Sequence, residues 1–424
     1  MKYQKIVKDN YNLHIINTDK FKTINVRINF KRKINKEEIT IRNLLNDLLI
    51  NTSKKYPTSR DIEIETEDLY NVGVGSTPYK SGNYHIMSFK ETFLDEKYTE
   101  KGMNEKSIEF LLELIFNPNV KDKKFDKEYF NLIKKTVEDD ILSIKDNPGK
   151  YSLIKLYESM DDGPLSYRSS GYLNDLKKIN EENIYEYYKS VLKNDIIDIF
   201  IIGNINENKL DIFDKYIKNN NCIKDNTPHY IKLHSTSDEL ELKESITNNQ
   251  SKLAIGFTTD NLSDYELKYV LVIYSLILGG SPNSKLFQNV REKNSLCYYI
   301  NTSVAIISKI VTLTAGINAK DYKKTLELIN IELEKMKKGE FTTKDIEDAR
   351  KIYINGCNEV YDSPMAIINN YLSYEYGGLD LVEKRLKEIK KVTKKDIVDV
   401  ANKVNINKIF LLEGTSNNEK EKTE

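Results

Sequence analysis

The sequence predicts an α+β protein of two homologous domains, each a mostly antiparallel sheet covered by helices. Strand patterns and amphipathic helices alternate along the 424 residues, and one segment recurs in the second half of the chain. Segments 125–148 and 341–364 have the same length, begin with Phe and end in Asp-x-Pro, at an offset of 216 residues. Self-similarity at a fixed spacing is typical of a duplicated fold. Chance similarity in a chain rich in Lys, Ile and Asn is the alternative.

Each copy is expected to run strand, helix, strands, helices and a final strand. Residues 24–30 and 251–257 alternate apolar and polar side chains near the start of the copies, which predicts strands. The β-rich runs 199–203 and 409–412 predict the final strands. Between them, apolar residues at helical spacing predict amphipathic helices; the set at Phe110, Leu111, Leu114 and Ile115 is an example.

These patterns divide the chain into four parts. We expect an N-terminal domain over 1–205, a connector over 206–250, a C-terminal domain over 251–416 and a disordered tail over 417–424. The connector is polar and is expected to mix helix with loop. The tail is a short run of mixed charge, which is typical of disorder.

Composition excludes several classes of partner. Basic and acidic residues number 65 each, so no global field attracts nucleic acid or an anionic membrane surface. No apolar run reaches the roughly 20 residues that a membrane span needs. The three cysteines form neither a disulfide framework nor a C-x-x-C pair, and no signal peptide is evident. We therefore expect a cytoplasmic protein without nucleic-acid or membrane partners.

The most informative stretch lies between Leu278 and Tyr299. Gly279 and Gly280 close an apolar helix pattern, a short helix follows over 284–293, and Arg291 and Tyr298 lie where it gives way to a strand. This stretch resembles the C-terminal half of the pitrilysin and mitochondrial-processing-peptidase family, zinc peptidases with LuxS/MPP-like domains and an inverted H-x-x-E-H motif.

The resemblance implies that Arg291 and Tyr298 grip the backbone of a peptide substrate. Gly279 and Gly280 are expected to form a tight turn at positive φ, where glycine is favoured at a helix end. The residues alone leave an alternative open. Arg291 then pairs with Glu292, and Tyr298 is an ordinary strand aromatic.

The resemblance also locates the place of the zinc site, where the ligands are missing. In the family two histidines on one helix face bind zinc, the Glu between them is the general base, and a downstream Glu is the third ligand. Alignment puts Asn43, Asn46, Asp47 and Asp140 at these positions, as ordinary helix residues of a degenerate site. No histidines pair at i, i+4, so we expect no metal; a site rebuilt from displaced ligands is the alternative. The histidines are His14, His85, His229 and His234.

The function that the resemblance implies is that of a partner subunit. Small members of the family work as pairs, in which one subunit supplies zinc and the other the Arg/Tyr surface. This chain is expected to be the non-catalytic, substrate-binding subunit of a heterodimeric zinc peptidase, with zinc held by a homologous H-x-x-E-H subunit and a peptide as substrate. The alternative is a non-enzymatic scaffold or a peptide-binding maturation factor on the same fold. The identity of the peptide and the formation of a homodimer stay open.

Overall fold

A computed structural model describes residues 1–218, 220, 229–233, 239–259 and 261–415. The tail expected over 417–424 lies outside these residues, as does His234. The chain divides into two compact units, which are described separately. Unit 1 comprises Met1–Ser143, Arg168–Thr227 and Ser363–Asn369, and unit 2 comprises Ile144–Tyr167, Pro228–Asp362 and Asn370–Glu424.

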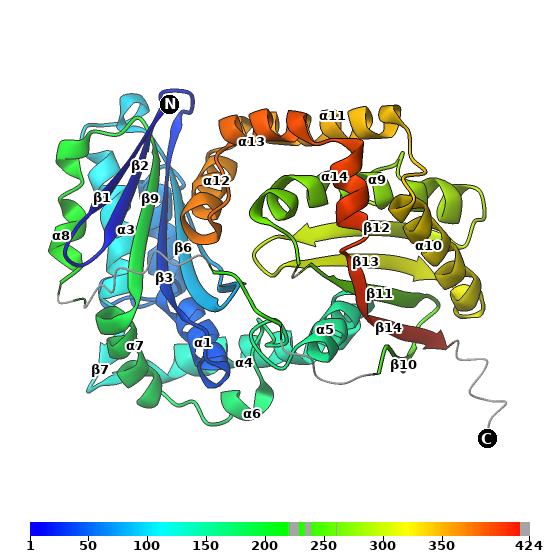
Figure 1. The fold of residues 1–424 in the computed structure, drawn as a ribbon. Helices are drawn as coiled ribbons and strands as arrows, with labels where there is room; N and C mark the ends of the chain where they lie inside the picture. Colours follow the sequence, from blue (N-terminus) through cyan, green and yellow to red (C-terminus); the bar gives the residue numbers. More distant parts are fainter. Residues whose placement is uncertain (219, 221–228, 234–238, 260, 416–424) are drawn as a thin grey trace, which may run out of the picture. The chain divides into compact units, whose positions relative to one another are not determined.

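Unit 1 is built on a seven-stranded sheet in the order β1-β2-β9-β3-β6-β4, with β5 also paired to β6 (Figure 1). The strand β2 is parallel to β9, and the remaining neighbours are antiparallel. A separate hairpin is formed by β7 and β8. The strands are β1 Lys2–Val7, β2 Asn12–Asn17, β3 Thr23–Lys33, β4 Gly73–Ser76, β5 Tyr79–Ser81, β6 Tyr84–Leu94, β7 Val120–Lys121, β8 Lys124–Phe125 and β9 Ile196–Gly203.

Helices cover one face of this sheet and form the core with it. The even positions of β3, from Ile24 to Phe30, point into this core and meet apolar residues of α1, α3, α4, α7 and α8. The odd positions of β3, from Asn25 to Lys31, are polar and are buried on the opposite face. The helices are α1 Ile39–Leu49, α2 Ser59–Asp68, α3 Met103–Phe116, α4 Lys127–Leu142, α6 Leu173–Leu176, α7 Asn183–Asn194 and α8 Ile212–Tyr216.

Unit 2 has a five-stranded sheet in the order β10-β14-β11-β13-β12, which leaves β12 at one edge. Two short π-helices, η5 Glu266–Val270 and η6 Phe287–Glu292, precede α9 and β12. The strands are β10 Glu241–Thr247, β11 Ser251–Thr258, β12 Cys297–Ala305, β13 Ile310–Ile317 and β14 Asn405–Thr415. The helices are α5 Pro148–Met160, α9 Leu271–Leu278, α10 Tyr322–Lys337, α11 Thr343–Glu359, α13 Val382–Glu388 and α14 Lys394–Ala401, while α12 Pro364–Gly377 divides between the units.

The two sheets repeat one topology, which confirms the predicted α+β fold of two homologous domains. Strands β2, β9, β3, β6 and β4 of unit 1 match β10, β14, β11, β13 and β12 of unit 2 in order and direction, including one parallel pair in each. The recurring Asp-x-Pro also has one structural role. Pro148 and Pro364 are the first residues of α5 and α12. Proline suits that position because its fixed φ fits a helix and its missing N–H would have no partner there.

The compact units differ from the sequence repeats in two exchanged segments. The helix α5 falls in the expected domain 1–205, yet it packs on β11 and β14 of unit 2. Gly256 of β11 permits this, because a Cβ there would collide with Met160 of α5. Ser363–Asn369 conversely joins unit 1. The expected connector 206–250 supplies α8 to unit 1 and β10 to unit 2, so it does more than join them.

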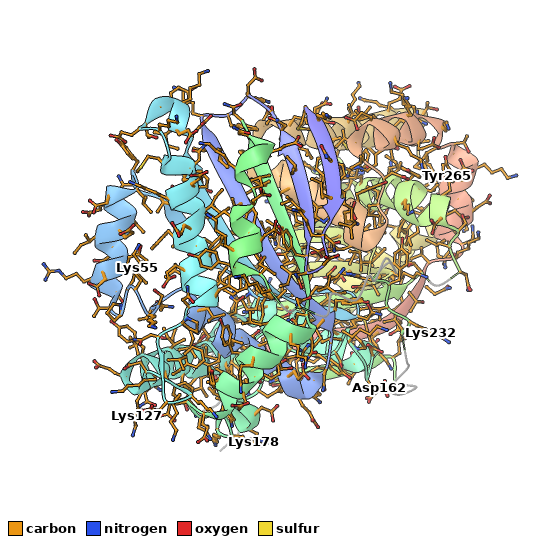
Figure 2. All side chains as sticks on the ribbon, turned by 90° about the vertical axis from the view of Figure 1, so that its left-hand side faces the viewer. Lys55, Lys127, Asp162, Lys178, Lys232 and Tyr265 are labelled. Atoms are coloured by element: carbon orange, nitrogen blue, oxygen red, sulfur yellow. The ribbon has the colours of Figure 1, made fainter. Side chains whose placement is uncertain are left out.

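Several lysines of unit 1 lie on its surface. Lys127 and Lys178, for example, are exposed and point away from the ribbon (Figure 2). Among the described residues, none of the helices combines the length and the apolar character that crossing a bilayer requires.

Candidate functional site

The helix α1 carries three of the four degenerate zinc positions on one face, because residues three and four apart are neighbours on a helix. Asn43 and Asn46 are buried, and Asp47 is half-buried. The helix α4 packs against α1 and carries Asp140. Burial raises the pKa of Asp47, hydrogen bonds from Ser76 and Asn46 oppose this rise, and the charge of Asp140 adds to it. The structure thus brings the positions of Asn43, Asn46, Asp47 and Asp140 together.

The side chain of Asn43 takes part in a network of hydrogen bonds. Its Nδ2 donates to the carbonyl of Ser169 at 2.5 Å, and its Oδ1 lies 3.2 Å from Nε2 of His85. Nε of Arg42 donates to Nδ1 of His85 at 3.0 Å, so Nδ1 is the acceptor and Nε2 carries the proton. Burial and the positive charge of Arg42 hold the pKa of His85 well below its ordinary value. His85 is therefore a neutral hydrogen-bond donor to Asn43.

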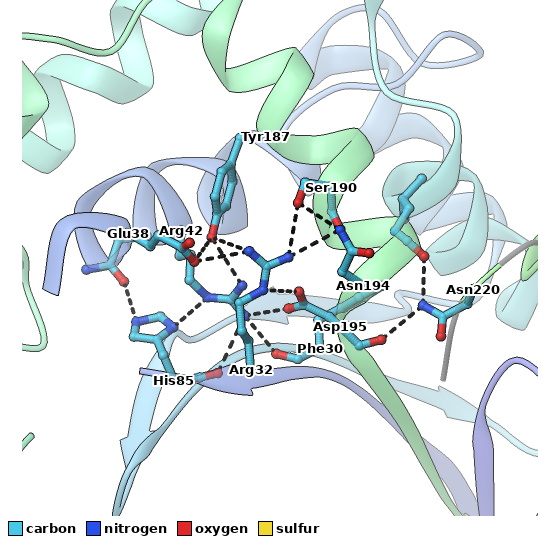
Figure 3. Close-up of polar contacts among 12 residues, drawn as sticks. Phe30, Arg32, Glu38, Arg42, His85, Tyr187, Ser190, Asn194, Asp195 and Asn220 are labelled. Atoms are coloured by element: carbon cyan, nitrogen blue, oxygen red, sulfur yellow. Dashed lines mark hydrogen bonds and ion pairs between the residues drawn. The ribbon is translucent and has the colours of Figure 1, made fainter. Parts of the chain in front are cut away.

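Behind this pair lies a buried ion cluster (Figure 3). The guanidinium of Arg42 is 1% exposed, pairs with Asp195 at 2.8 Å and donates to the carbonyl of Phe30 at 3.0 Å. Arg32 contacts the same Asp195 at 2.7 Å and also Glu38 at 3.1 Å. Two guanidinium groups thus share one fully buried carboxylate. This cluster fixes α1 to β3 and to the start of β9.

The donor set at the degenerate site does not fit zinc. Within the described part of the chain, no group of three or more His, Cys, Asp or Glu side chains is placed to hold a metal ion. Asp47 and Asp140 offer two carboxylates, while His85 is engaged on both ring nitrogens. Asparagine amides do not replace imidazole ligands or a general base. A site rebuilt from displaced ligands therefore finds no support in these residues.

The glycine turn has a different physical basis from the one expected. The helix α9 ends at Leu278 as predicted, but Gly279 has φ −152° and Gly280 is not at positive φ either. The expectation of a left-handed turn was wrong. A Cβ on Gly279 would lie 2.7 Å from Cγ2 of Thr302. The hydroxyl of the same Thr302 donates to the carbonyl of Ser275 at 2.9 Å. Glycine is needed because the end of α9 lies directly against β12.

Arg291 lies in η6, beside the start of β12. Its guanidinium is 4.5 Å from the ring centre of Phe287 and 3.5 Å from Glu292, and the side chain is 38% exposed. The ion pair with Glu292 is the one that the alternative interpretation expected. Burial raises the pKa of the Cys297 thiol to about 11, and Arg291 opposes this rise, so the guanidinium lies near the residue before Tyr298.

Tyr298 lies at a β-bulge. In the pairing of β12 with β13, Cys297 faces Ile317 and Tyr299 faces Gly316, so Tyr298 has no partner residue opposite it. A bulge re-aims side chains, and here two consecutive tyrosines are exposed, Tyr298 by 62% and Tyr299 by 38%. The phenol of Tyr298 makes no hydrogen bond with the described residues. Arg291 and Tyr298 thus lie at the same end of β12 without a direct bond between them.

Sequence reasoning missed the buried cluster around Arg42. Arg42, His85 and Asp195 are far apart in the sequence and meet only through the pairing of β3 with β6 and β9. One signal was available, because Arg42 shares the apolar face of α1 with Leu45 and Leu49. A charge on such a face predicts a buried counter-ion.

Comparison with known proteins agrees with this geometry. Residues 178–353 match the protein family described as "Peptidase M16 inactive domain". The chain is 27% identical over 410 residues, 95% of each chain, to "Probable inactive metalloprotease YmfF" of Bacillus subtilis. The chain is thus similar to inactive members of the M16 peptidase family. With Asn43, Asn46 and Asp47 in place of H-x-x-E-H, this M16 homologue is not a peptidase on its own.

Two further proteins are similar to this chain, one by its solved structure and one by its sequence. A crystal structure of a conserved protein from Enterococcus faecalis V583 superimposes with a TM-score of 0.90 at 27% identity, covering 98% of this chain and 99% of that one. "Uncharacterized zinc protease YmxG" of Bacillus subtilis is 25% identical over 217 residues, 47% of this chain and 52% of that protein. The M16 homologue is therefore similar to a protein described as a probable inactive metalloprotease and, over 47% of its own length, to one described as a zinc protease.

Proposed function

We propose that this M16 homologue is the non-catalytic, substrate-binding subunit of a heterodimeric zinc peptidase. A homologous subunit with H-x-x-E-H supplies the zinc and the general base. Arg291 and Tyr298 bind the peptide at that zinc site. Because the donor set around Asn43 does not fit zinc, cleavage depends entirely on the partner.

The observation that carries the proposal is the unbonded phenol of Tyr298. The bulge in β12 directs it outward at 62% exposure, beside the half-exposed guanidinium of Arg291. A hydroxyl and a guanidinium are donors suited to a peptide carbonyl and to the oxyanion that develops on it during hydrolysis. A protein that served only as a scaffold would have no use for this pair.

The relatives support a paired function. Bacillus subtilis contains both the inactive metalloprotease and the zinc protease to which this chain is similar. A genome that retains an inactive copy beside a zinc-binding one is expected if the two copies complete one site. The proposal predicts a gene for an H-x-x-E-H subunit in the genome that encodes this chain.

Co-expression of the two subunits tests the proposal. Size-exclusion chromatography with light scattering should give a 1:1 complex, and the complex alone should cleave peptides. In the complex, Arg291→Ala or Tyr298→Phe should each reduce kcat more than a hundredfold, because a donor that acts in the transition state contributes about 3 kcal/mol. Assembly and melting temperature should change little, since Tyr298 has no partner within the described residues.

Tyr299→Phe is the matched control, because it removes a hydroxyl from the adjacent exposed tyrosine of the same strand. It should retain activity. Two subunits that elute as separate monomers would contradict the pairing. A folded complex in which the Arg291 and Tyr298 variants keep wild-type turnover would instead favour the scaffold or maturation factor.

A further inference from the structure

Two cations lie directly opposite each other on the polar face of the sheet of unit 1. Arg27 in β3 and Lys90 in β6 are paired in the register of these antiparallel strands, so both side chains point to the face opposite the helical core. Arg27 is only 6% exposed, and Lys90 is half-buried. Like charges directly opposite each other in a sheet destabilise it, so this pair requires a physical explanation.

The hydrogen-bond partners of the Arg27 guanidinium and the ring beside it are neutral. Its Nε donates to Oγ of Ser88 at 2.9 Å, its Nη1 donates to Oδ1 of Asn369 at 2.7 Å, and it lies 5.2 Å from the ring centre of Tyr79. No carboxylate pairs with it among the residues that the structure describes. Lys90 makes no hydrogen bond or ion pair there either. Burial and the charge of Arg27 lower the pKa of Lys90.

The carboxylate of Asp198 on the same face is already engaged. Asp198 in β9 is paired in register with Asn29, one pleat away from Arg27. It accepts a hydrogen bond from Asn12 at 2.8 Å and lies 3.7 Å from Nζ of Lys31. The adjacent carboxylate in β6, Glu91, lies in the core on the other face. Arg27 and Lys90 therefore form a positive site that the protein itself does not neutralise.

A buried charge without a counter-ion destabilises a folded protein, and proteins retain such a feature chiefly at functional sites. Guanidinium and ammonium groups both donate charge-assisted hydrogen bonds to carboxylates. We propose that Arg27 and Lys90, with the hydroxyls of Ser88 and Tyr79, form a binding site for a carboxylate group of a peptide. The peptide as the source of that carboxylate rests on the proposed function. The carboxylate belongs either to an Asp or Glu side chain or to the C-terminus.

Lys90→Gln is the informative variant, because Lys90 is half-buried and bonds to no described residue, whereas Arg27 also anchors Asn369. Three fluorescent ten-residue peptides distinguish the two sources. One carries a central Glu and an amidated C-terminus, the second has Gln at that position, and the third has Gln with a free C-terminal carboxylate. Lys178→Gln, at a lysine exposed by 75%, is the control for loss of one positive charge.

In fluorescence anisotropy, the wild-type protein should bind one of the two carboxylate peptides about tenfold more tightly than the uncharged one. This preference should disappear in Lys90→Gln and remain in Lys178→Gln. Equal binding of all three peptides would overturn the carboxylate site while leaving the proposed function in place.

A second experiment uses N-acetylglutamate as the ligand and tests the carboxylate site without any peptide. This ligand should raise the melting temperature of the wild-type protein, relative to N-acetylglutamine at equal ionic strength, and should not do so for Lys90→Gln. If this shift occurs while no peptide binds to the chain alone or to its complex with the H-x-x-E-H subunit, the carboxylate site stands and the proposed function fails. If neither the shift nor peptide binding to either form occurs, both are wrong.

Discussion

The substitution Asp195→Asn should destabilise unit 1 far more than the loss of an ordinary ion pair. Asp195 is fully buried, and it is the carboxylate that both Arg42, at 2.8 Å, and Arg32, at 2.7 Å, contact. An asparagine keeps the shape of the side chain and removes its charge. Arg42 would then be 1% exposed with only neutral partners, which include the carbonyl of Phe30, Nδ1 of His85 and the hydroxyl of Tyr187.

The magnitude follows from the burial of Arg42. Removing one partner of a buried pair leaves an uncompensated charge and costs about 3–5 kcal/mol. Asp139→Asn is the matched control, because it changes the same carboxylate to the same amide where the partner Lys135 and Asp139 are both 61% exposed. Such an exposed pair contributes about 0.3–0.5 kcal/mol. The total stability of a domain is about 5–15 kcal/mol, so the two variants should differ clearly.

Urea unfolding followed by far-UV circular dichroism measures this difference, since the chain has no tryptophan. Hydrogen–deuterium exchange in α1 and β9 then shows whether the loss lies in unit 1. The double variant Arg42→Met/Asp195→Asn should recover part of the loss, because it leaves no unpaired charge at Arg42. The reasoning fails if Asp195→Asn and Asp139→Asn unfold at the same urea midpoint, or if the double variant loses the sum of the two single effects.

Two further predictions concern the buried carboxyl of Glu91 and the degenerate zinc site. The carboxyl of Glu91 in β6 is 0% exposed, and neither of its oxygens has a partner among the described residues. Burial raises the pKa of this carboxyl well above its ordinary value. The folded state therefore holds this proton to higher pH than the unfolded chain, so the free energy of unfolding should fall as pH rises above about 4.5. Glu91→Gln should remove this pH dependence of the free energy of unfolding, measured by urea unfolding at several pH values. The same pH dependence in the wild-type protein and in Glu91→Gln would contradict the prediction. The purified chain should also bind no stoichiometric zinc after dialysis, because Asn43 and Asn46 replace a ligand and the base; one zinc per chain in metal analysis, with cleavage of casein, would be the opposite result.

The architecture could be predicted from the sequence because local patterns determine it. Alternation along β3 and β11, helical spacing in α3 and the repeated Asp-x-Pro before α5 and α12 are properties of short segments. The missing zinc motif is equally local, since two histidines at i, i+4 either occur or do not. Both predictions needed only residues that are neighbours in the chain.

Other features depend on contacts between distant segments. Asn43 was expected to be an ordinary helix residue, yet it bonds to Ser169 and His85, which no spacing rule connects to it. Gly279 and Gly280 were correctly predicted to lie at a helix end, but the positive φ that was expected there was wrong. The sequence does not show that β12 lies close against the end of α9. The exchange of α5 and Ser363–Asn369 between the units is likewise a matter of packing.

The sequence by itself thus determined the α+β class, the duplication and the absence of the zinc ligands. The tertiary structure decided which charges meet. It buries Arg42 against Asp195 by pairing β3 with β9, and it aligns Arg27 with Lys90 by pairing β3 with β6. The physical reason is that strand register places residues tens of positions apart within a few ångströms of each other. The energy of a buried charge then depends on that partner and not on its neighbours in the chain.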